Sequence, residues 1–268
     1  MVSLNCRLLE IPYLKWLNDM RTRAIIIKKQ NTNEYDQLVT CYTQELGKLT
    51  AVAKSVLKPR SAQAMQLDTL NLVSFELVSG RGMPIIAAAQ AERSFAGIKE
   101  SLPKLAAMHF FLEVLDRMAY DGQRDDALWD FLTGLLNDAD TVPQAGLLPL
   151  FRARQLELLH ILGYSPEAGQ CVLCGSGEVR AGWALSAESG GLLCRQCFLS
   201  GRRGVLLRRD DLAFLTSGPF SPAAAAAPFR SVIDAVFEHL AGFRFNSLAF
   251  LYGLPDGIFS TGMRRATI

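Results

Sequence analysis

Four of the six cysteines form two CxxC pairs, a spacing typical of metal sites. The first pair is Cys171 and Cys174, and the second is Cys194 and Cys197. Two intervening residues let both thiolates of a pair point at one ion, and two such pairs complete a tetrahedral sulfur shell. Because four protein ligands leave no open coordination position, the spacing predicts a structural site and not a catalytic one.

Zinc is the metal that this pattern favours, and iron held by four thiolates, as in rubredoxin, is the alternative. The chain carries no second redox element that would give iron a task. Cytoplasmic thiols stay reduced, so paired cysteines there indicate metal and not disulfides. Trp183, Leu185 and Leu192 lie between the pairs and are expected to form a short ribbon with a small core. Cys41 lies in an apolar segment and is expected in the core.

Charge is distributed unevenly along a chain whose net charge is only +2. Residues 21–60 hold eight cationic and three anionic side chains, whereas residues 113–140 hold two cationic and eight anionic ones. A basic segment of this kind can contact a phosphate backbone without reading bases. The candidate DNA-binding residues are Lys28, Lys29, Lys48, Lys54, Lys58 and Arg60.

Residue parity gives this expectation a geometric form. Lys48, Lys54 and Lys58 are all even-numbered, so they share one face if a single unbroken strand carries them. The alternative is an ordinary solvated sheet face. Few aromatic residues accompany these lysines, so binding is expected to be electrostatic, independent of sequence and weakened by salt.

The expected secondary structure that positions these residues changes from strands to helices near residue 95. Before it, short segments rich in β-branched and aromatic residues alternate with turn signals, which predicts about five strands and a small closed barrel. The expected strands are Arg23–Lys29, Leu38–Thr43, Lys48–Val56, Leu67–Val78 and Ile85–Ala91. The apolar phase of the fourth slips near Leu72, which predicts a bulge or break there.

After residue 95 the apolar residues recur at helical spacing. Helices are expected from about Pro103, around Leu128–Leu136, over Leu147–Leu162 with Gly163 as its C-terminal stop, and over Asp210–Leu215 and Phe229–Ala241. Residues 221–228 look like an Ala/Pro linker.

Several function classes find no support in the sequence. The three histidines lie in expected helices, no phosphate-binding loop is present, and the carboxylates of residues 113–140 lack a paired context, so the chain is not expected to be an enzyme. No apolar run approaches the roughly 18 residues of a membrane span, so a cytoplasmic protein is expected. Residues 1–20 fit none of the following pattern, and we expect a loose extension or a true start at Met20.

One block of motifs carries a family resemblance. Phe151-Arg-Ala-Arg154, Leu162-Gly163-Tyr164-Ser165-Pro166 and Cys171-Val-Leu-Cys174-Gly175 follow one another, with Glu45-Leu46-Gly47-Lys48-Leu49 upstream and Gly190-Gly191 before the second cysteine pair. In order and spacing this block closely resembles the RecO family of recombination mediators, over about residues 21–250.

The resemblance implies an α+β protein. An N-terminal OB-fold β-barrel at 21–95 would precede an α-helical domain at 96–254 with a four-cysteine zinc-ribbon insert at about 168–203, and 255–268 would form a tail. It further implies binding of single- and double-stranded DNA, strand annealing, and association with RecR and with the C-terminal tail of single-stranded-DNA-binding protein (SSB). The outcome would be loading of RecA on SSB-coated strands in the RecF pathway, at the nucleoid. Arg152, Arg154, Arg202 and Arg203 are candidates for the acidic tail, although Arg152 and Arg154 could equally be structural.

Three other classes remain open from the residues alone. The first is a zinc-ribbon OB-fold protein that binds RNA in transcription or translation. The second is a redox or metal-transfer protein that uses its four cysteines directly, and the third is a nuclease whose metal carboxylates carry no familiar motif.

Overall fold

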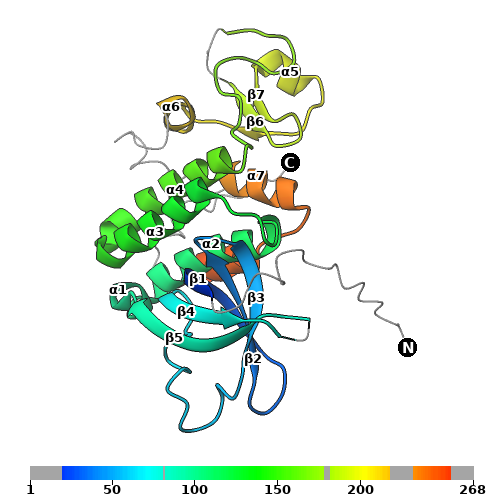
Figure 1. The fold of residues 1–268 in the computed structure, drawn as a ribbon. Coiled ribbons are helices and arrows are strands. Elements are labelled where there is room, and N and C mark those ends of the chain that lie inside the picture. Colours follow the sequence, from blue (N-terminus) through cyan, green and yellow to red (C-terminus); the bar gives the residue numbers. More distant parts are fainter. Residues whose placement is uncertain (1–19, 81, 178–181, 218–231, 255–268) are drawn as a thin grey trace. The chain divides into compact units, whose positions relative to one another are not determined.

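The structure is a computed structural model that describes residues 20–80, 82–177, 182–217 and 232–254. The chain divides into two compact units (Figure 1). The first comprises Met1–Ala96 and Phe111–Leu136, and the second comprises Gly97–Phe110 and Asn137–Ile268.

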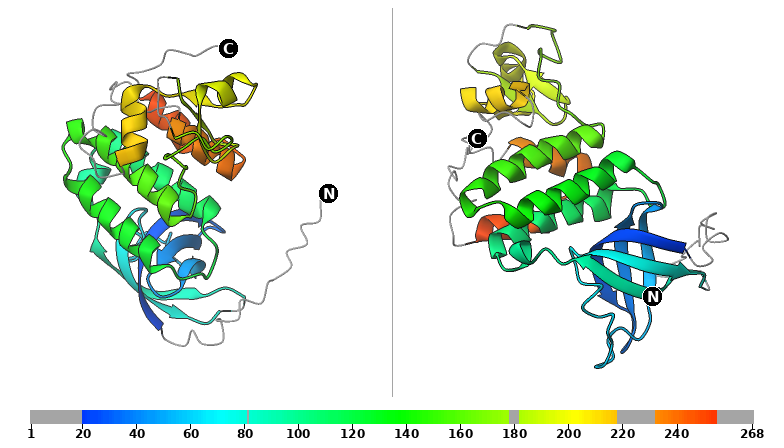
Figure 2. Two further views of the ribbon diagram at one scale, coloured as in Figure 1. Left: turned by 90° about the horizontal axis from the view of Figure 1, so that it is seen from above. Right: turned by 60° about the vertical axis from the view of Figure 1, so that its left-hand side comes forward.

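The first unit is built on a closed barrel of five strands in the order β1-β2-β3-β5-β4 (Figure 2). The strands are β1 (Met20–Asn31), β2 (Gln37–Thr43), β3 (Gly47–Ala53), β4 (Leu72–Val78) and β5 (Ile85–Arg93). All neighbours are antiparallel except β3 and β5, which pair in parallel. This order and this single parallel pair are those of an OB fold, as expected from the resemblance.

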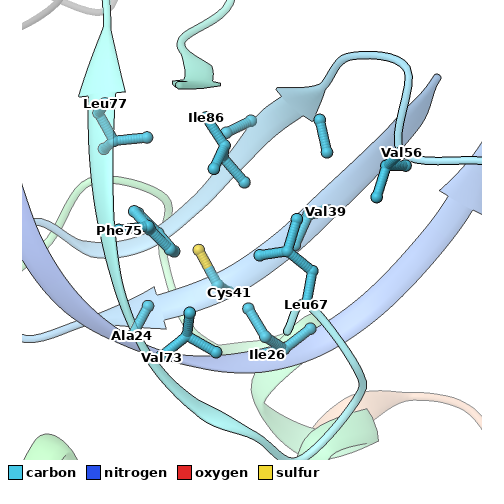
Figure 3. Packing of buried hydrophobic residues seen from close by; sticks show 12 residues of the cluster. Ala24, Ile26, Val39, Cys41, Val56, Leu67, Val73, Phe75, Leu77 and Ile86 are labelled. Carbon is cyan, nitrogen blue, oxygen red and sulfur yellow. The ribbon is translucent and has the colours of Figure 1, made fainter. Parts of the chain in front are cut away.

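Aliphatic side chains and the Cys41 thiol fill the barrel, with one large ring among them (Figure 3). The alternation of buried positions in β3 and β4 follows from the two-residue period of a strand. Phe75 and Cys41 are 1% and 0% exposed, so both are core residues, as was expected for Cys41. Removing this apolar surface from water is the main stabilising term for the barrel.

The expected break near Leu72 is confirmed. Strand β4 begins at Leu72, and Leu70 before it has a left-handed φ of 70°. The register of β4 against β5 also shifts between Leu72 and Val73. Residues 67–71 are therefore not part of the strand, although Leu67 and Leu70 are fully buried.

Parts of two long helices complete the first unit. Helix α2 (Leu102–Met118) contributes its residues from Phe111 onward, and α3 (Asp126–Thr141) contributes its residues up to Leu136. The rings of Phe111 and Phe131 pack with centroids 6.0 Å apart.

The second unit combines helices around an aromatic core. They are α1 (Ala96–Lys99), the 3₁₀ turn η2 (Gln144–Gly146), α4 (Leu147–Ile161), α6 (Arg209–Ser217), α7 (Val232–Ala241) and α8 (Asn246–Gly253). Phe110 meets Phe151, Phe237 and Phe245 edge-on, with centroids 5.2 to 5.4 Å apart. Such contacts add roughly 0.5–1.5 kcal/mol each beyond area burial.

The cysteine-bearing insert follows α4 within the second unit. Its three-stranded sheet has the order β7-β6-β8, with β6 (Ala184–Ser186), β7 (Gly191–Leu193) and β8 (Val205–Leu206), and α5 (Arg195–Leu199) follows β7 (Figure 1). Trp183, Leu185 and Leu192 are at most 3% exposed, which confirms the expected ribbon core.

The helices expected from about Pro103, around 128–136, over 147–162 and over 210–215 are confirmed, with boundary shifts of a few residues. Gly163 has φ of 79° and its N–H meets the His160 carbonyl at 3.0 Å, as a C-terminal stop requires. The helix expected over 229–241 is described from Val232. The predictions for residues 1–19, for the 221–228 linker and for the 255–268 tail lie outside the described residues. None of the described helices combines the length and apolarity needed to cross a bilayer.

Candidate metal centre and charged surfaces

The four expected cysteine ligands come together at one point of the insert. The sulfur atoms of Cys171, Cys174, Cys194 and Cys197 all lie within 4.8 Å of one another, and the Cys174 and Cys194 sulfurs are 3.7 Å apart. A tetrahedron of thiolates about 2.3 Å from an ion places its sulfurs roughly 3.8 Å apart, whereas a disulfide would need about 2.05 Å. The geometry therefore fits a four-sulfur metal site and no disulfide.

Backbone turns hold the first cysteine pair in place. The Gly175 N–H donates to the Cys171 carbonyl at 2.9 Å, and the Cys171 N–H donates to the Ser176 carbonyl at 2.9 Å. Gly175 has φ of 72°, a left-handed conformation that is strained for residues with a side chain, which explains why glycine occupies this turn.

The thiols of the cluster differ in acidity. Burial raises the pKa of the Cys171 thiol, but the backbone amides of Cys194, Cys174 and Leu173 outweigh it and lower the pKa to about 6. Cys197 shows the opposite, because the adjacent Cys194 thiol raises its pKa to about 12. Four thiolates this close repel one another, and a divalent cation would offset that repulsion.

A close backbone approach joins the start of the insert to its sheet. A Cβ atom on Gly191 would lie 2.6 Å from the Glu167 carbonyl oxygen and 2.7 Å from a methyl carbon of Val172. The Leu192 N–H donates to that same Glu167 carbonyl, and the Val172 N–H donates to the Leu192 carbonyl, both at 2.9 Å. Gly191 is thus required for the first knuckle to pack on β7.

The basic side chains of the barrel are largely opposed by carboxylates of the same unit. Among the described residues the pairs are Arg21–Glu76, Arg23–Glu92, Lys28–Asp116, Lys29–Asp68 and Lys48–Asp121. Lys48 is only 9% exposed and also donates to the Asp116 carbonyl at 2.9 Å. Part of the acidic segment therefore faces the barrel instead of forming a solvated face alone.

The single lysine row expected from parity is not formed. Strand β3 ends at Ala53, so the condition of an unbroken strand is not met. Lys48 lies inside the strand and is nearly buried, whereas Lys54 and Lys58 follow it in turns and are exposed. An early strand end separates side chains that parity would have aligned.

Three of the six candidate DNA-binding residues lie beyond the end of β3, and one of them, Lys58, lies over an exposed tyrosine ring. We call Tyr35, Lys54, Lys58 and Arg60 the loop surface. All four are exposed, and the Lys58 ammonium lies 5.4 Å from the centre of the Tyr35 ring. An exposed ring with adjacent cations can stack a base while the cations meet phosphates.

Asp36, which sequence reasoning did not single out, joins the two loops of this surface. Its carboxylate accepts from the Ser55 N–H at 2.6 Å and from the Asn33 side-chain amide at 3.1 Å. These hydrogen bonds lower the pKa of Asp36 below its ordinary value. Asn33 and Asp36 are typical turn residues, so the sequence indicated a loop at this position. It did not indicate that Asp36 would accept a hydrogen bond from Ser55 in the other loop.

Arg152 and Arg154 are both paired with carboxylates of the protein itself. Arg152 is 1% exposed and donates to Gln155 at 2.6 Å, to Asp234 at 2.8 Å and to the Tyr252 hydroxyl at 2.8 Å. Arg154 pairs with Glu157 and Asp138. The structural role considered for both is therefore the one supported, while Arg202 and Arg203 are exposed.

Comparison with known proteins agrees with this architecture. The family model described as "Recombination protein O N terminal" matches residues 17–95, and the one described as "Recombination protein O C terminal" matches residues 99–245. Both units therefore contain residues of the matched regions.

Curated relatives agree as well. The "DNA repair protein RecO" of Symbiobacterium thermophilum is 31% identical over 189 residues, which cover 69% of this chain and 73% of the relative. Its namesake in Syntrophomonas wolfei is 30% identical over 198 residues, covering 74% and 77%. That of Moorella thermoacetica is 27% identical over 262 residues, covering 91% and 95%.

These names are those of a DNA repair and recombination protein and not of an enzyme, in agreement with the expectation that the chain is not one. The two family models together cover the barrel, most of the helices and the cysteine insert. The chain therefore belongs to the RecO family of DNA repair proteins.

Proposed function

We propose that this protein is a recombination mediator that binds single- and double-stranded DNA, anneals complementary strands and helps to load RecA on SSB-coated single strands. Its membership of the RecO family is the observation that carries the proposal. With no nucleotide-binding motif in the sequence, annealing would run on binding energy alone.

We further propose that the barrel contacts DNA through the loop surface. Lys54, Lys58 and Arg60 are exposed, and none of them pairs with a carboxylate among the described residues. Lys28, Lys29 and Lys48 would contribute less, because a phosphate must displace a carboxylate already bound to each. Glu34 and Asp36 lie in the same loops, so this surface holds only a small excess of positive charge.

The bound metal is proposed to be Zn²⁺ with a structural role. Cys171, Cys174, Cys194 and Cys197 would hold it, and its contribution would be to fix the two knuckles against each other. The sulfur spacing supports four ligands from the protein, which leaves the ion no position for a substrate.

Partner binding is proposed on the basis of the family alone. The partners would be RecR and the acidic C-terminal tail of SSB. The protein would act in the cytoplasm, at the nucleoid.

The proposal is tested by annealing two labelled complementary oligonucleotides and monitoring duplex formation by energy transfer between the labels. Acceleration by the protein, also on SSB-coated strands, is the expected result. A matched RNA competitor should displace DNA no better than a DNA competitor does. Absence of acceleration, or a clear preference for RNA, would favour the RNA-binding alternative.

A further inference from the structure

Five arginines gather in a short stretch of the cysteine insert. They are Arg195, Arg202, Arg203, Arg208 and Arg209, and no acidic residue lies between the first and the last. All five are exposed. We call these five residues the arginine surface.

The arginine surface differs from the basic residues on the strands of the barrel in its lack of ion-pair partners. Within the described part of the chain, none of its five members forms an ion pair. Arg21 and Arg23 of the barrel are also exposed, yet each is bonded to a glutamate. Uncompensated guanidinium groups in one small ribbon leave a local positive potential that the insert itself does not use.

The sheet topology brings two parts of this surface to one end of the ribbon. Strands β7 and β8 are both antiparallel to β6, so they run in the same direction on either side of it. Leu193 and Leu206 both pair with Ala184, and Arg195 and Arg208 each lie two residues further on. Their backbones therefore leave the sheet at equivalent positions, about 10 Å apart across two strand spacings.

The remaining arginines lie close to these two in the chain, and Arg209 is the first residue of α6. Arg209 follows Arg208 directly, while Arg202 and Arg203 lie in the connection from α5 to β8. Since strands of two or three residues are only about 7–10 Å long, the five cations are spread over a patch of small dimensions.

The metal centre does not account for these charges. A zinc ion with four thiolates carries a net charge of −2, and Glu188, Asp210 and Asp211 add three negative charges in the same segment. The excess of positive charge is therefore local to the arginine surface and is not a property of the whole insert. The nearby Asp211 carboxylate accepts from the backbone N–H of Arg208 at 2.7 Å and is 6% exposed. Guanidinium groups that remain in solvent are suited to bidentate contacts with phosphate.

We propose that the arginine surface of the cysteine insert is a second nucleic-acid-binding surface, which contacts the phosphate backbone without reading sequence. A linear polyanion suits charges placed at both ends of a small ribbon better than a short acidic peptide anchored by an apolar pocket does. The two most exposed apolar residues of this stretch, Leu199 and Leu206, are 70% and 57% exposed, which is too open to line such a pocket.

This inference rests on the proposed DNA-binding function and extends it. A protein that anneals strands must hold two of them, and a surface in each unit would provide one site for each. The barrel offers the loop surface with its aromatic ring, whereas the insert offers charge alone. The insert surface is therefore expected to bind single and double strands with similar dependence on salt.

The test compares three matched double variants of the full-length protein by fluorescence anisotropy with labelled single- and double-stranded oligonucleotides. Two lie on the arginine surface, Arg195→Gln with Arg208→Gln and Arg202→Gln with Arg203→Gln. The control, Arg21→Gln with Arg23→Gln, removes the same charge from exposed but paired positions. Metal content and thermal unfolding of each variant report whether the insert is intact, and the second variant keeps the test valid if Arg195 affects the neighbouring ligands.

Each lost phosphate contact should reduce the slope of log K against log salt by about 0.7 on a single strand, which is roughly 25-fold in affinity for two contacts near 0.1 M salt. The control should change affinity much less. If both arginine variants bind DNA as the wild type does while loop-surface variants bind weakly, the inference is overturned and the proposed function stands. If those variants keep DNA binding but lose an acidic peptide probe, the surface binds peptide instead and the inference is again overturned. If the wild type binds no DNA, the proposed function itself fails.

Discussion

Replacement of Arg152 by methionine should destabilise the second unit strongly. The guanidinium is fully buried and bonded to Asp234, Gln155 and Tyr252, and its Nε is the one buried side-chain nitrogen or oxygen without a hydrogen bond among the described residues. Methionine would fill much of the volume but leave the Asp234 carboxylate, 6% exposed, without its cation. Breaking a buried pair in this way typically costs about 3–5 kcal/mol.

A loss of that size corresponds to a fall in melting temperature of roughly 6–20 °C for a domain of 150–250 residues. Because the chain has two units, hydrogen exchange measured by mass spectrometry should show the loss in α4 and α7 first. The matched control is Arg244→Met, which removes an exposed arginine from the same unit and should leave stability unchanged.

A double variant isolates the pair from the cost of an unpaired charge. With Asp234→Leu added to Arg152→Met, no buried charge remains at this position, so a large part of the lost stability should return. The reasoning is refuted if the single variant melts within about 2 °C of the wild type, or if the double variant is less stable than the single one.

Three further predictions concern the metal centre and the loops. Cys174→Ser should lower the melting temperature and the metal content while single-strand affinity changes far less; equal loss of both in a folded protein would contradict a structural role. Gly191→Ala should destabilise the insert by about 1–3 kcal/mol, because its new methyl group would meet the Glu167 carbonyl and Val172, and unchanged unfolding would contradict the observed packing. Asp36 should titrate below 3.8 by NMR, so its contribution to loop stability is present above that pH and is lost as pH falls through the lower, folded value. A midpoint at or above 3.8 would argue against its bond to Ser55.

The sequence could predict the elements that local pattern determines. A two-residue alternation and turn signals located the five strands, and the slip near Leu72 located the break before β4. The two CxxC pairs located the four-cysteine cluster because two residues between cysteines nearly fix the sulfur positions. Helix α8 was not predicted, since its eight residues are apolar on most sides and show little helical period.

Contacts between distant residues were beyond the reach of local pattern. Parity placed Lys48 in a solvent-facing row, but Asp116 and Asp121 are 68 and 73 positions away in the chain and draw it inward. Arg152 pairs with Asp234, which lies 82 residues further along the chain, and no local sequence pattern indicates that pair. Charge counted along the sequence therefore identified a basic segment but not which of its cations stay available.

DNA binding by the loop surface is the central claim, and a salt series of single-strand binding tests it most directly. The wild type should be compared with a triple variant in which Lys54, Lys58 and Arg60 are changed to alanine, and with the paired control Arg21→Gln with Arg23→Gln. The account predicts tight binding at low salt, a slope shallower by up to about 2 in the triple variant, and little change in the control. A folded triple variant with wild-type affinity and slope would contradict the claim.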